Sequence, residues 1–157
     1  MKGLWFEEFE IGMKFEHALT RTVTEMDNVL FTALTHNPQP LHLDAHFAEA
    51  NSEFKKPLVN SIFTLGLVIG VSVGDTTLGT TVGNLGMSEV RFPKPVFHGD
   101  TIRSTTEIIG KRESKSRPDT GIVEFLHRGY NQRGELVAEC KRQGMMKKKP
   151  TTSAKKA

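Results

Sequence analysis

The fold depends most on residues 60–73, which read NSIFTLGLVIGVSV. This stretch is the most hydrophobic in the chain and is apolar on all sides, so it forms either a buried helix or a buried strand. Its length favours the helix, because most strands have only about 4–8 residues. Gly66 and Gly70 give such a helix one smooth side, against which a sheet or another backbone could pack. We therefore predict a long buried helix at the centre of the domain.

The chain that follows this helix has the pattern of a sheet. Turn-forming residues divide it into four segments rich in β-branched or alternating apolar residues, at 80–95, 101–112, 121–131 and 135–146. Helical segments followed by a run of strands indicate an α+β fold. We expect an antiparallel sheet wrapped around a long central hydrophobic helix.

The N-terminal part predicts one strand and a first helix. Residues 12–22 have the pattern of a strand, and Thr24 and Asp27 are placed to form a capping box for the helix that follows. The apolar residues of this helix recur at helical spacing and define the side expected to face the core: Met26, Val29, Leu30, Ala33 and Leu34.

Prolines shape the next segment. Pro38 disfavours helix at Asn37, so the first helix should end near His36. Residues 37–44 are expected to form a loop, and residues 45–51 one or two helical turns.

Composition indicates one globular domain with a basic C-terminal end. The length of 157 residues suits one domain, and 37% hydrophobic with 25% charged residues is typical of a folded chain. Five lysines fall within the last eleven residues, so the formal net charge of +3 becomes −2 when these five charges are subtracted. We predict a folded domain over residues 1–146 and a disordered basic tail over residues 147–157. Because the net positive charge comes from the tail, we expect neither nucleic acid nor a membrane as a partner.

Cysteine content and hydropathy favour the cytoplasm. Cys140 is the only cysteine, which excludes an internal disulfide, and we expect it to be buried and inert. No apolar run reaches the ~18 residues of a membrane-spanning helix. The acidic and aromatic N-terminus is unlike a signal peptide.

Four stretches carry a family resemblance. They read FTALTHNPQPLHLDAHFA at 31–48, PLVNSIFTLGL at 57–67, RFPKPVFHGDT at 91–101 and NQRGELV at 131–137. In this order they resemble the MaoC-like branch of the hot-dog superfamily, which includes the R-specific enoyl-CoA hydratases. The resemblance extends over residues 9–146. It implies a single hot-dog fold, a homodimer or higher homo-oligomer, and an acyl-CoA substrate with no cofactor.

The resemblance also implies a hydro-lyase, either an enoyl-CoA hydratase or a 3-hydroxyacyl-CoA dehydratase. In these hydratases an Asp, and a His five residues later, together hold the reacting water. Here His42 occupies the position of the His, Asn37 that of the Asp, and Gln39 that of a family Asn between them. An amide cannot accept a proton at neutral pH, so we expect His42 to act as base and acid in turn while Asn37 holds the water. Asp44 is an alternative source of the missing carboxylate.

The start of the central helix is the expected binding site for the thioester oxygen. Unpaired N–H groups and the helix dipole favour negative charge there. Asn60 and Ser61 stand where the family has His-Gly, and the backbone N–H of Ser61 is present whatever its side chain. We expect Gln39 and Asp44 to contact substrate as well. Candidates for the CoA phosphates are Lys55, Lys56, Arg91 and Lys94, and no His/Cys cluster has the spacing of a metal site.

Two other functions remain open. Asn37 in place of the family Asp favours a non-catalytic protein that binds acyl thioesters. Hot-dog thioesterases generally use a carboxylate near the central helix, and here Glu53 is the one that precedes it. If the protein is a hydratase, the same departure suggests a specialised one that acts on a short, branched or dicarboxylic acyl-CoA.

Overall fold

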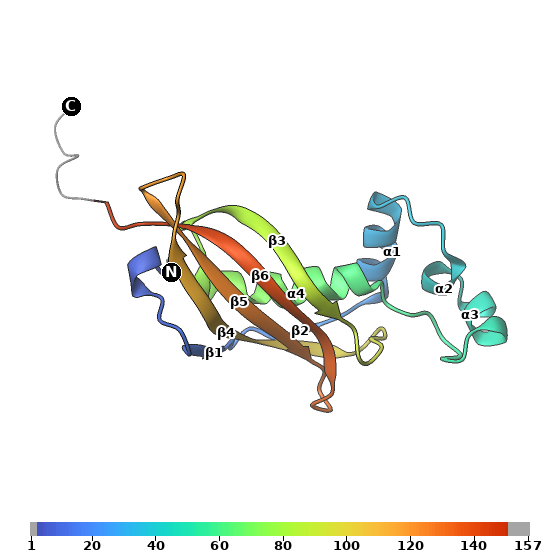
Figure 1. Cartoon of the computed structure of the whole chain (residues 1–157). Helices are drawn as coiled ribbons and strands as arrows, with labels where there is room; N and C mark the ends of the chain where they lie inside the picture. The colour runs from blue at the N-terminus through green and yellow to red at the C-terminus, as the bar shows by residue number, and fades with distance from the viewer. Residues whose placement is uncertain (1–2, 151–157) are drawn as a thin grey trace.

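The structure, a computed structural model, describes residues 3–150 of the chain. A curved sheet lies around one long helix, and three short helices project from one end of it (Figure 1). The helices are the 3-10 helix η1 (Phe6–Glu8), α1 (Glu25–Leu34), α2 (Pro40–Leu43), α3 (Ala45–Asn51) and α4 (Ser61–Thr76). The strands are β1 (Lys14–Glu16), β2 (Arg21–Thr22), β3 (Thr81–Arg91), β4 (Thr101–Glu113), β5 (Thr120–Tyr130) and β6 (Leu136–Lys147).

The sheet is antiparallel, with the strand order β1-β4-β5-β6-β3 and with β2 also paired to β4. Strands β4, β5 and β6 pair along nearly their whole length and form the middle of the sheet. Strand β3 is an edge strand that pairs with β6. Helix α4 packs so closely on the inner side of β5 that a Cβ on Gly129 would lie 2.2 Å from a methyl group of Val68. An antiparallel sheet around one central helix is the hot-dog fold that the sequence predicted.

The buried apolar residues form two clusters. One joins α4 to the segment before β4 and to β6, and comprises Val23, Val59, Val68, Val96, Ile102, Val137 and Ala138. The other lies beneath the N-terminal segment and comprises Phe6, Phe9, Ile108, Val123, Phe125 and Met146. Cys140 is buried as predicted, and burial raises the pKa of its thiol.

The side of helix α1 that faces the core is the opposite of the one predicted. Thr24 and Asp27 form the expected capping box, so the start of the helix is confirmed. The buried residues of α1, however, are Asn28 and Thr32, both 0% exposed. The apolar residues expected in the core are exposed instead, by 75% at Met26, 41% at Val29, 55% at Leu30 and 72% at Leu34. Periodicity identifies a helix, but it does not tell whether the apolar side packs on the chain's own core.

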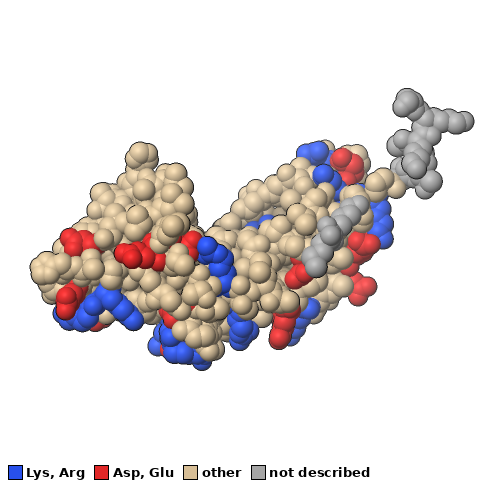
Figure 2. Space-filling model, turned by 180° about the vertical axis from the view of Figure 1, so that it is seen from behind, with Lys and Arg blue, Asp and Glu red and all other residues tan. Residues whose placement is uncertain are grey.

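Helix α4 is also not buried on all sides. Ile62 is 56% exposed, and nothing lies within 4 Å of a Cβ built on Gly66 or Gly70. The glycine side of α4 therefore faces away from the sheet. Seen from behind, the molecule has a notch between the part that carries α1–α3 and the rest, and the upper walls of this notch hold few charged side chains (Figure 2).

Two boundaries in the first half of the chain differ from the prediction. The strand expected over residues 12–22 is interrupted, and it forms β1 and β2 instead. Helix α2 lies inside the loop expected over residues 37–44, where Pro40 takes the first helical position that suits its fixed φ.

The folded part continues beyond residue 146, the predicted boundary. Lys147 is the last residue of β6, and the N–H of Lys148 donates to the carbonyl of Asp119 at 3.0 Å. Lys149 forms an ion pair with Glu8. Residues 151–157, the rest of the predicted tail, lie outside the described residues.

Candidate active site

The loop between α1 and α2 brings His42 to the wall of a hollow. His36 turns the chain with a φ of 52°, and the side-chain oxygen of Asn37 then accepts the N–H of Gln39 at 3.0 Å. This bond closes a turn that leads directly into α2, the helix that carries His42. The hollow has a volume of about 350 Å³ and is lined by Phe31, Thr35, Asn37, His42, Asn60, Ser61 and Ile62.

A backbone carbonyl fixes the tautomer of His42. The Nδ1 atom of His42 lies 2.7 Å from the oxygen of Leu58, a carbonyl that can only accept a hydrogen bond. Nδ1 must therefore carry the proton, and in the neutral ring Nε2 is left as an acceptor. Within residues 3–150 no protein group forms a hydrogen bond with Nε2. A half-buried imidazole with a free Nε2 is suited to take a proton from water.

Helix α4 begins at the same hollow. The side chain of Asn60 accepts the N–H of Ile62 at 3.0 Å and so caps the helix. Ser61 is the first helical residue, and its N–H has no acceptor within the helix. This N–H and the positive end of the helix dipole can bind a negatively charged oxygen.

Ser61 also lines a second cavity, of about 400 Å³. Its walls are mainly apolar. They come from the segment before α4, from the loop between β3 and β4, and from one further residue of α4 and one of β6: Phe54, Leu58, Val59, Phe92, Pro93, Lys94, Pro95, Val96, Thr64 and Val137. The two cavities share Ser61, so both lie at the start of α4.

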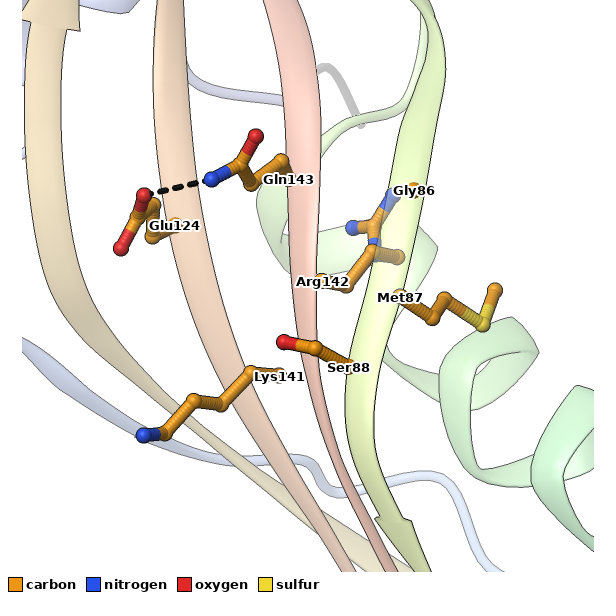
Figure 3. Close-up of a pocket in the computed structure, with 7 residues that line it drawn as sticks. All are labelled: Gly86, Met87, Ser88, Glu124, Lys141, Arg142 and Gln143. Carbon is orange, nitrogen blue, oxygen red and sulfur yellow. Dashed lines mark hydrogen bonds between the residues drawn. The ribbon is translucent and has the colours of Figure 1, made fainter.

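A further hollow of about 240 Å³ lies across β3, β5 and β6 and contains none of the site residues described above (Figure 3). Its polar side chains are largely engaged with neighbours. Gln143 donates to Glu124 at 2.7 Å, and Lys141 forms an ion pair with Glu89 at 2.6 Å. This hollow is therefore not part of the candidate site.

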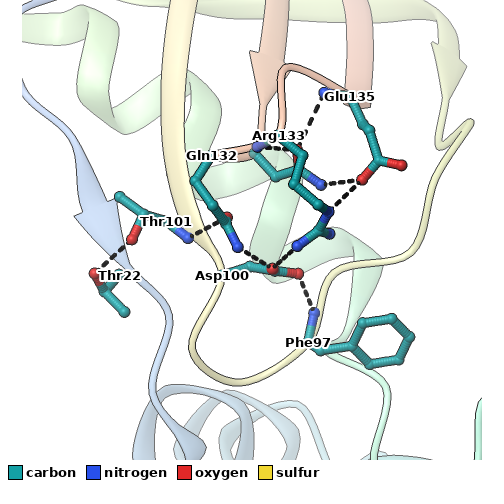
Figure 4. Close-up of polar contacts among 8 residues, drawn as sticks. Thr22, Phe97, Asp100, Thr101, Gln132, Arg133 and Glu135 are labelled. Carbon is teal, nitrogen blue, oxygen red and sulfur yellow. Dashed lines mark hydrogen bonds and ion pairs between the residues drawn. The ribbon is translucent and has the colours of Figure 1, made fainter.

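A buried carboxylate holds the loop that lines the second cavity. Asp100 accepts the N–H of Phe97 at 2.9 Å and side-chain bonds from Gln132 at 2.8 Å and Arg133 at 3.0 Å (Figure 4). Burial alone would raise the pKa of Asp100, but these three donors outweigh it and hold the pKa below the usual value of a carboxyl. The β5–β6 turn thus anchors the β3–β4 loop.

Some of the predicted site residues have other partners. The carboxylate of Asp44 caps α3 by accepting the N–H of Phe47 at 2.8 Å, and Asp44 lines neither cavity. Gln39 is the N-terminal cap residue of α2, and its side chain is exposed. Arg91 forms an ion pair with Glu139. Asp44 is therefore not placed to supply the missing carboxylate.

The predicted lysines differ in their relation to the second cavity. Lys94 lines it directly. The ammonium of Lys56 lies 4.0 Å from the centre of the Phe97 ring, a cation–π contact that fixes its position. Lys55 is exposed and adopts a left-handed conformation with a φ of 56°.

Sequence reasoning missed Asn28. Its amide is fully buried and lies within hydrogen-bonding distance of His42 O, Leu58 O and Asn60 N. The sequence around Asn28 carries no local signal of this role, because its partners lie 14 to 32 residues further along the chain. Within residues 3–150, no group of three His, Cys, Asp or Glu residues could hold a metal ion, and no helix is long and apolar enough to cross a membrane.

The chain is similar in sequence to two named hydratases and in fold to a solved structure. The mesaconyl-CoA hydratase of Cereibacter sphaeroides is 36% identical over 96% of this chain, which spans only 43% of that relative. The (R)-specific enoyl-CoA hydratase of Aeromonas caviae is 32% identical over 83% of this chain and 90% of its own length. The crystal structure of a monoamine oxidase regulatory protein from Archaeoglobus fulgidus superposes with a TM-score of 0.83 at 34% identity, over 96% of this chain and 98% of that one. Residues 7–128 match the MaoC-like domain model, and the chain therefore belongs to the MaoC-like dehydratase family.

Proposed function

We propose that the protein catalyses the reversible addition of water to a 2-enoyl-CoA thioester. The observation that carries the proposal is the orientation of His42, whose Nδ1 is held 2.7 Å from the Leu58 carbonyl. This leaves Nε2 as a base on the hollow that also contains the start of α4 at Ser61. A base and an oxyanion donor on one hollow are what the reaction requires. The names of the two hydratase relatives support the same reaction.

The steps use only these groups, water and the thioester. Nε2 of His42 takes a proton from water as the water oxygen bonds to C3, and the C2–C3 π electrons move towards the thioester oxygen. The N–H of Ser61 stabilises the charge on that oxygen. The imidazolium then returns the proton to C2, which leaves His42 neutral and the product a 3-hydroxyacyl thioester. The reverse steps remove water, and the proposal includes no cofactor.

We propose a short, branched or dicarboxylic acyl group as the substrate. One relative is named for mesaconyl-CoA, whose acyl group is a branched unsaturated dicarboxylic acid with five carbons. The hollow of about 350 Å³ at His42 suits an acyl group of this size. In the second cavity we propose the CoA arm, with Lys94 and Lys56 near its phosphates. The cytoplasmic location remains a prediction from the sequence.

We also propose that the protein works as a homodimer or a higher homo-oligomer. The apolar side of α1, the glycine side of α4 and the free edge of β3 are all exposed in the single chain. Strand β3 adds exposed apolar residues along that edge, namely Val82, Leu85, Met87 and Val90. Exposed apolar surface of this extent suits a second copy of the chain, as does the notch whose upper walls hold few charged side chains (Figure 2).

One observation favours the alternative of a non-catalytic thioester-binding protein. The side-chain oxygen of Asn37 accepts the N–H of Gln39, so one of its two lone pairs serves the turn rather than a water in the hollow. A thioesterase gains no such support, because Glu53 is exposed and lines neither cavity.

The test is to incubate the purified protein with enoyl-CoA thioesters from crotonyl-CoA to branched and dicarboxylic C5 species. Loss of the conjugated enoyl absorbance would be followed together with mass spectrometry. We expect a mass gain of one water on at least one substrate, without release of free CoA. Tight binding without water addition to any substrate would overturn the proposal in favour of a binding protein, and release of free CoA would indicate a thioesterase.

A further inference from the structure

One buried amide connects the parts of the candidate site. Asn28, in α1, is 0% exposed. Its Nδ2 lies 3.1 Å from the carbonyl oxygen of His42 and 3.0 Å from that of Leu58, and its Oδ1 accepts the N–H of Asn60 at 2.9 Å. Its Nδ2 is also 3.1 Å from Nε2 of His98. A single side chain thus joins α1 to α2, to the start of α4 and to the loop before β4.

The orientation of this amide is fixed by its partners. The carbonyls of His42 and Leu58 can only accept, and the N–H of Asn60 can only donate. Rotating the Asn28 amide by half a turn would therefore oppose acceptor to acceptor and donor to donor. A carboxylate in its place would keep the bond from Asn60 but would set an oxygen against two carbonyls. No other standard side chain of this size supplies both groups.

Each backbone partner of Asn28 has a role at the site. The Leu58 carbonyl accepts a hydrogen bond from Nδ1–H of His42, with 2.7 Å between Nδ1 and the oxygen, and so it sets the tautomer and the direction of the ring. The contact between Nδ2 of Asn28 and the carbonyl oxygen of His42 holds the backbone of His42 itself. The bond from the N–H of Asn60 to Oδ1 of Asn28 holds Asn60. This residue immediately precedes Ser61, whose N–H is proposed to bind the thioester oxygen. Asn28 therefore sets the position of the base relative to the oxyanion site.

We infer that Asn28 is a positioning residue of the hydration site, which keeps His42 in its Nδ1–H form and at a fixed separation from the start of α4. The inference rests on the proposed hydratase function. Asn28 touches neither cavity and so does not contact the substrate. Asn28 instead holds in place the groups that contact the substrate. An error of about 1 Å in the position of such groups can lower the rate about 100-fold.

The test compares Asn28→Asp with Thr32→Val. Thr32 lies one helical turn further along the same buried side of α1, and within residues 3–150 its hydroxyl has no hydrogen-bond partner. Thr32→Val thus changes a buried polar residue of α1 without removing a bond of the site. Asn28→Ser is a second variant that adds no charge. All variants are compared at equal folded fraction, measured by far-ultraviolet circular dichroism.

Two measurements separate positioning from general damage. The first is kcat and KM for an enoyl-CoA that the wild type hydrates. The second is the tautomer of His42 in protein with 15N-labelled histidine, assigned by the signal that His42→Ala removes. In the Asn28 variants we expect kcat to fall about 10- to 100-fold with KM within about threefold, and the His42 Nδ1–H preference to be lost. We expect neither change in Thr32→Val.

Wild-type kcat in Asn28→Asp and Asn28→Ser, or an equal loss of kcat in Thr32→Val, would overturn the inference and leave the proposed function standing. Failure of the proposed function is seen separately, as the absence of hydration by the wild type.

Discussion

At the scale of residues, two side chains that follow α1, Asn37 and His42, have different roles in the proposed reaction. The oxygen of Asn37 is used inside the loop, where it accepts the N–H of Gln39. Its NH2 group can donate to the oxygen of a water, which leaves the protons of that water directed towards other acceptors. Nε2 of His42 is such an acceptor on the same hollow. In this account His42 carries the proton transfers and Asn37 orients the water.

Replacing Asn37 tests this division. Asn37→Ala removes both the turn bond and the donor to water, and we expect kcat to fall about 10- to 100-fold. Asn37→Asp keeps an acceptor for the N–H of Gln39 and adds a carboxylate, so we expect its kcat to stay within about tenfold of wild type. Initial rates of enoyl-CoA hydration measure both. A wild-type rate in Asn37→Ala would remove Asn37 from the mechanism.

At the scale of elements, a buried polar chain crosses the inner side of the sheet. Nδ1 of His127 in β5 lies 2.9 Å from the hydroxyl of Thr106 in β4, and Arg142 in β6 donates to Nε2 of His127 at 3.1 Å. Burial, then the charges of Arg142 and His17, lower the pKa of His127 from 6.5 to about 3. His127 is therefore neutral in the folded protein, where Nε2 accepts from the guanidinium.

The lowered pKa of His127 makes the free energy of unfolding dependent on pH. Below a pH of about 6.5 the unfolded chain takes up a proton at position 127 that the folded chain takes up only near pH 3, so stability falls as the pH falls between these values. The contribution of one proton is about 1.4 kcal/mol per pH unit. We expect His127→Gln to reduce the slope of unfolding free energy against pH by about this amount between roughly pH 6 and pH 4.5. An unchanged slope in urea titrations would contradict the assignment.

Asp100 anchors the β3–β4 loop, so replacing it should affect both stability and substrate binding. Asp100→Ala removes a carboxylate that accepts bonds from Phe97, Gln132 and Arg133. We expect a loss of about 1–3 kcal/mol in unfolding free energy, since bonds to charged groups contribute this much. KM for the CoA thioester should rise too, because this loop lines the second cavity. Denaturant titration and steady-state kinetics measure the two effects, and an unchanged KM would show that the loop keeps its position without Asp100.

The sequence predicted elements better than it predicted which of their sides are buried. Turns and caps depend on local chemistry, so the four long strands and the start of α1 at Thr24 were found within a few residues. The burial of Asn28 depends on backbone groups far along the chain, and no local pattern reveals them. For the site, His42, Asn37 and Ser61 do line one hollow, whereas Asp44 forms the cap of α3, a role that its place directly before the helical residues 45–51 would have indicated.

At the scale of the whole molecule, the single chain leaves the sides of three elements open. The apolar side of α1, the glycines of α4 and the edge of β3 would be costly to expose in water. Pairing with a second copy would cover them, and it would also enclose the hollow at His42, whose wall includes Phe31 of α1 and Ile62 of α4.

A charge on the edge strand tests the pairing. Leu85 of β3 is 48% exposed, and Leu85→Lys should convert an oligomer into monomers because a lysine at the interface would lose its hydration. Ile11 is 66% exposed and lies outside α1, α4 and β3, so Ile11→Lys is the matched control. Light scattering after size-exclusion chromatography gives the masses. Equal masses for wild type and Leu85→Lys would exclude β3 from the interface.

Two histidines of the same region differ in their access to the hollow, and replacing each in turn tests whether His42 is the base. His42 lines the hollow with Nε2 free, whereas His46 is exposed in α3 and lines neither cavity. On an enoyl-CoA that the wild type hydrates, we expect His42→Ala to lose about 100- to 10,000-fold in kcat/KM and His46→Ala to keep the wild-type value. Hydration by His42→Ala at the wild-type rate, with the protein shown to be folded, would contradict the role of His42 and with it the proposed mechanism.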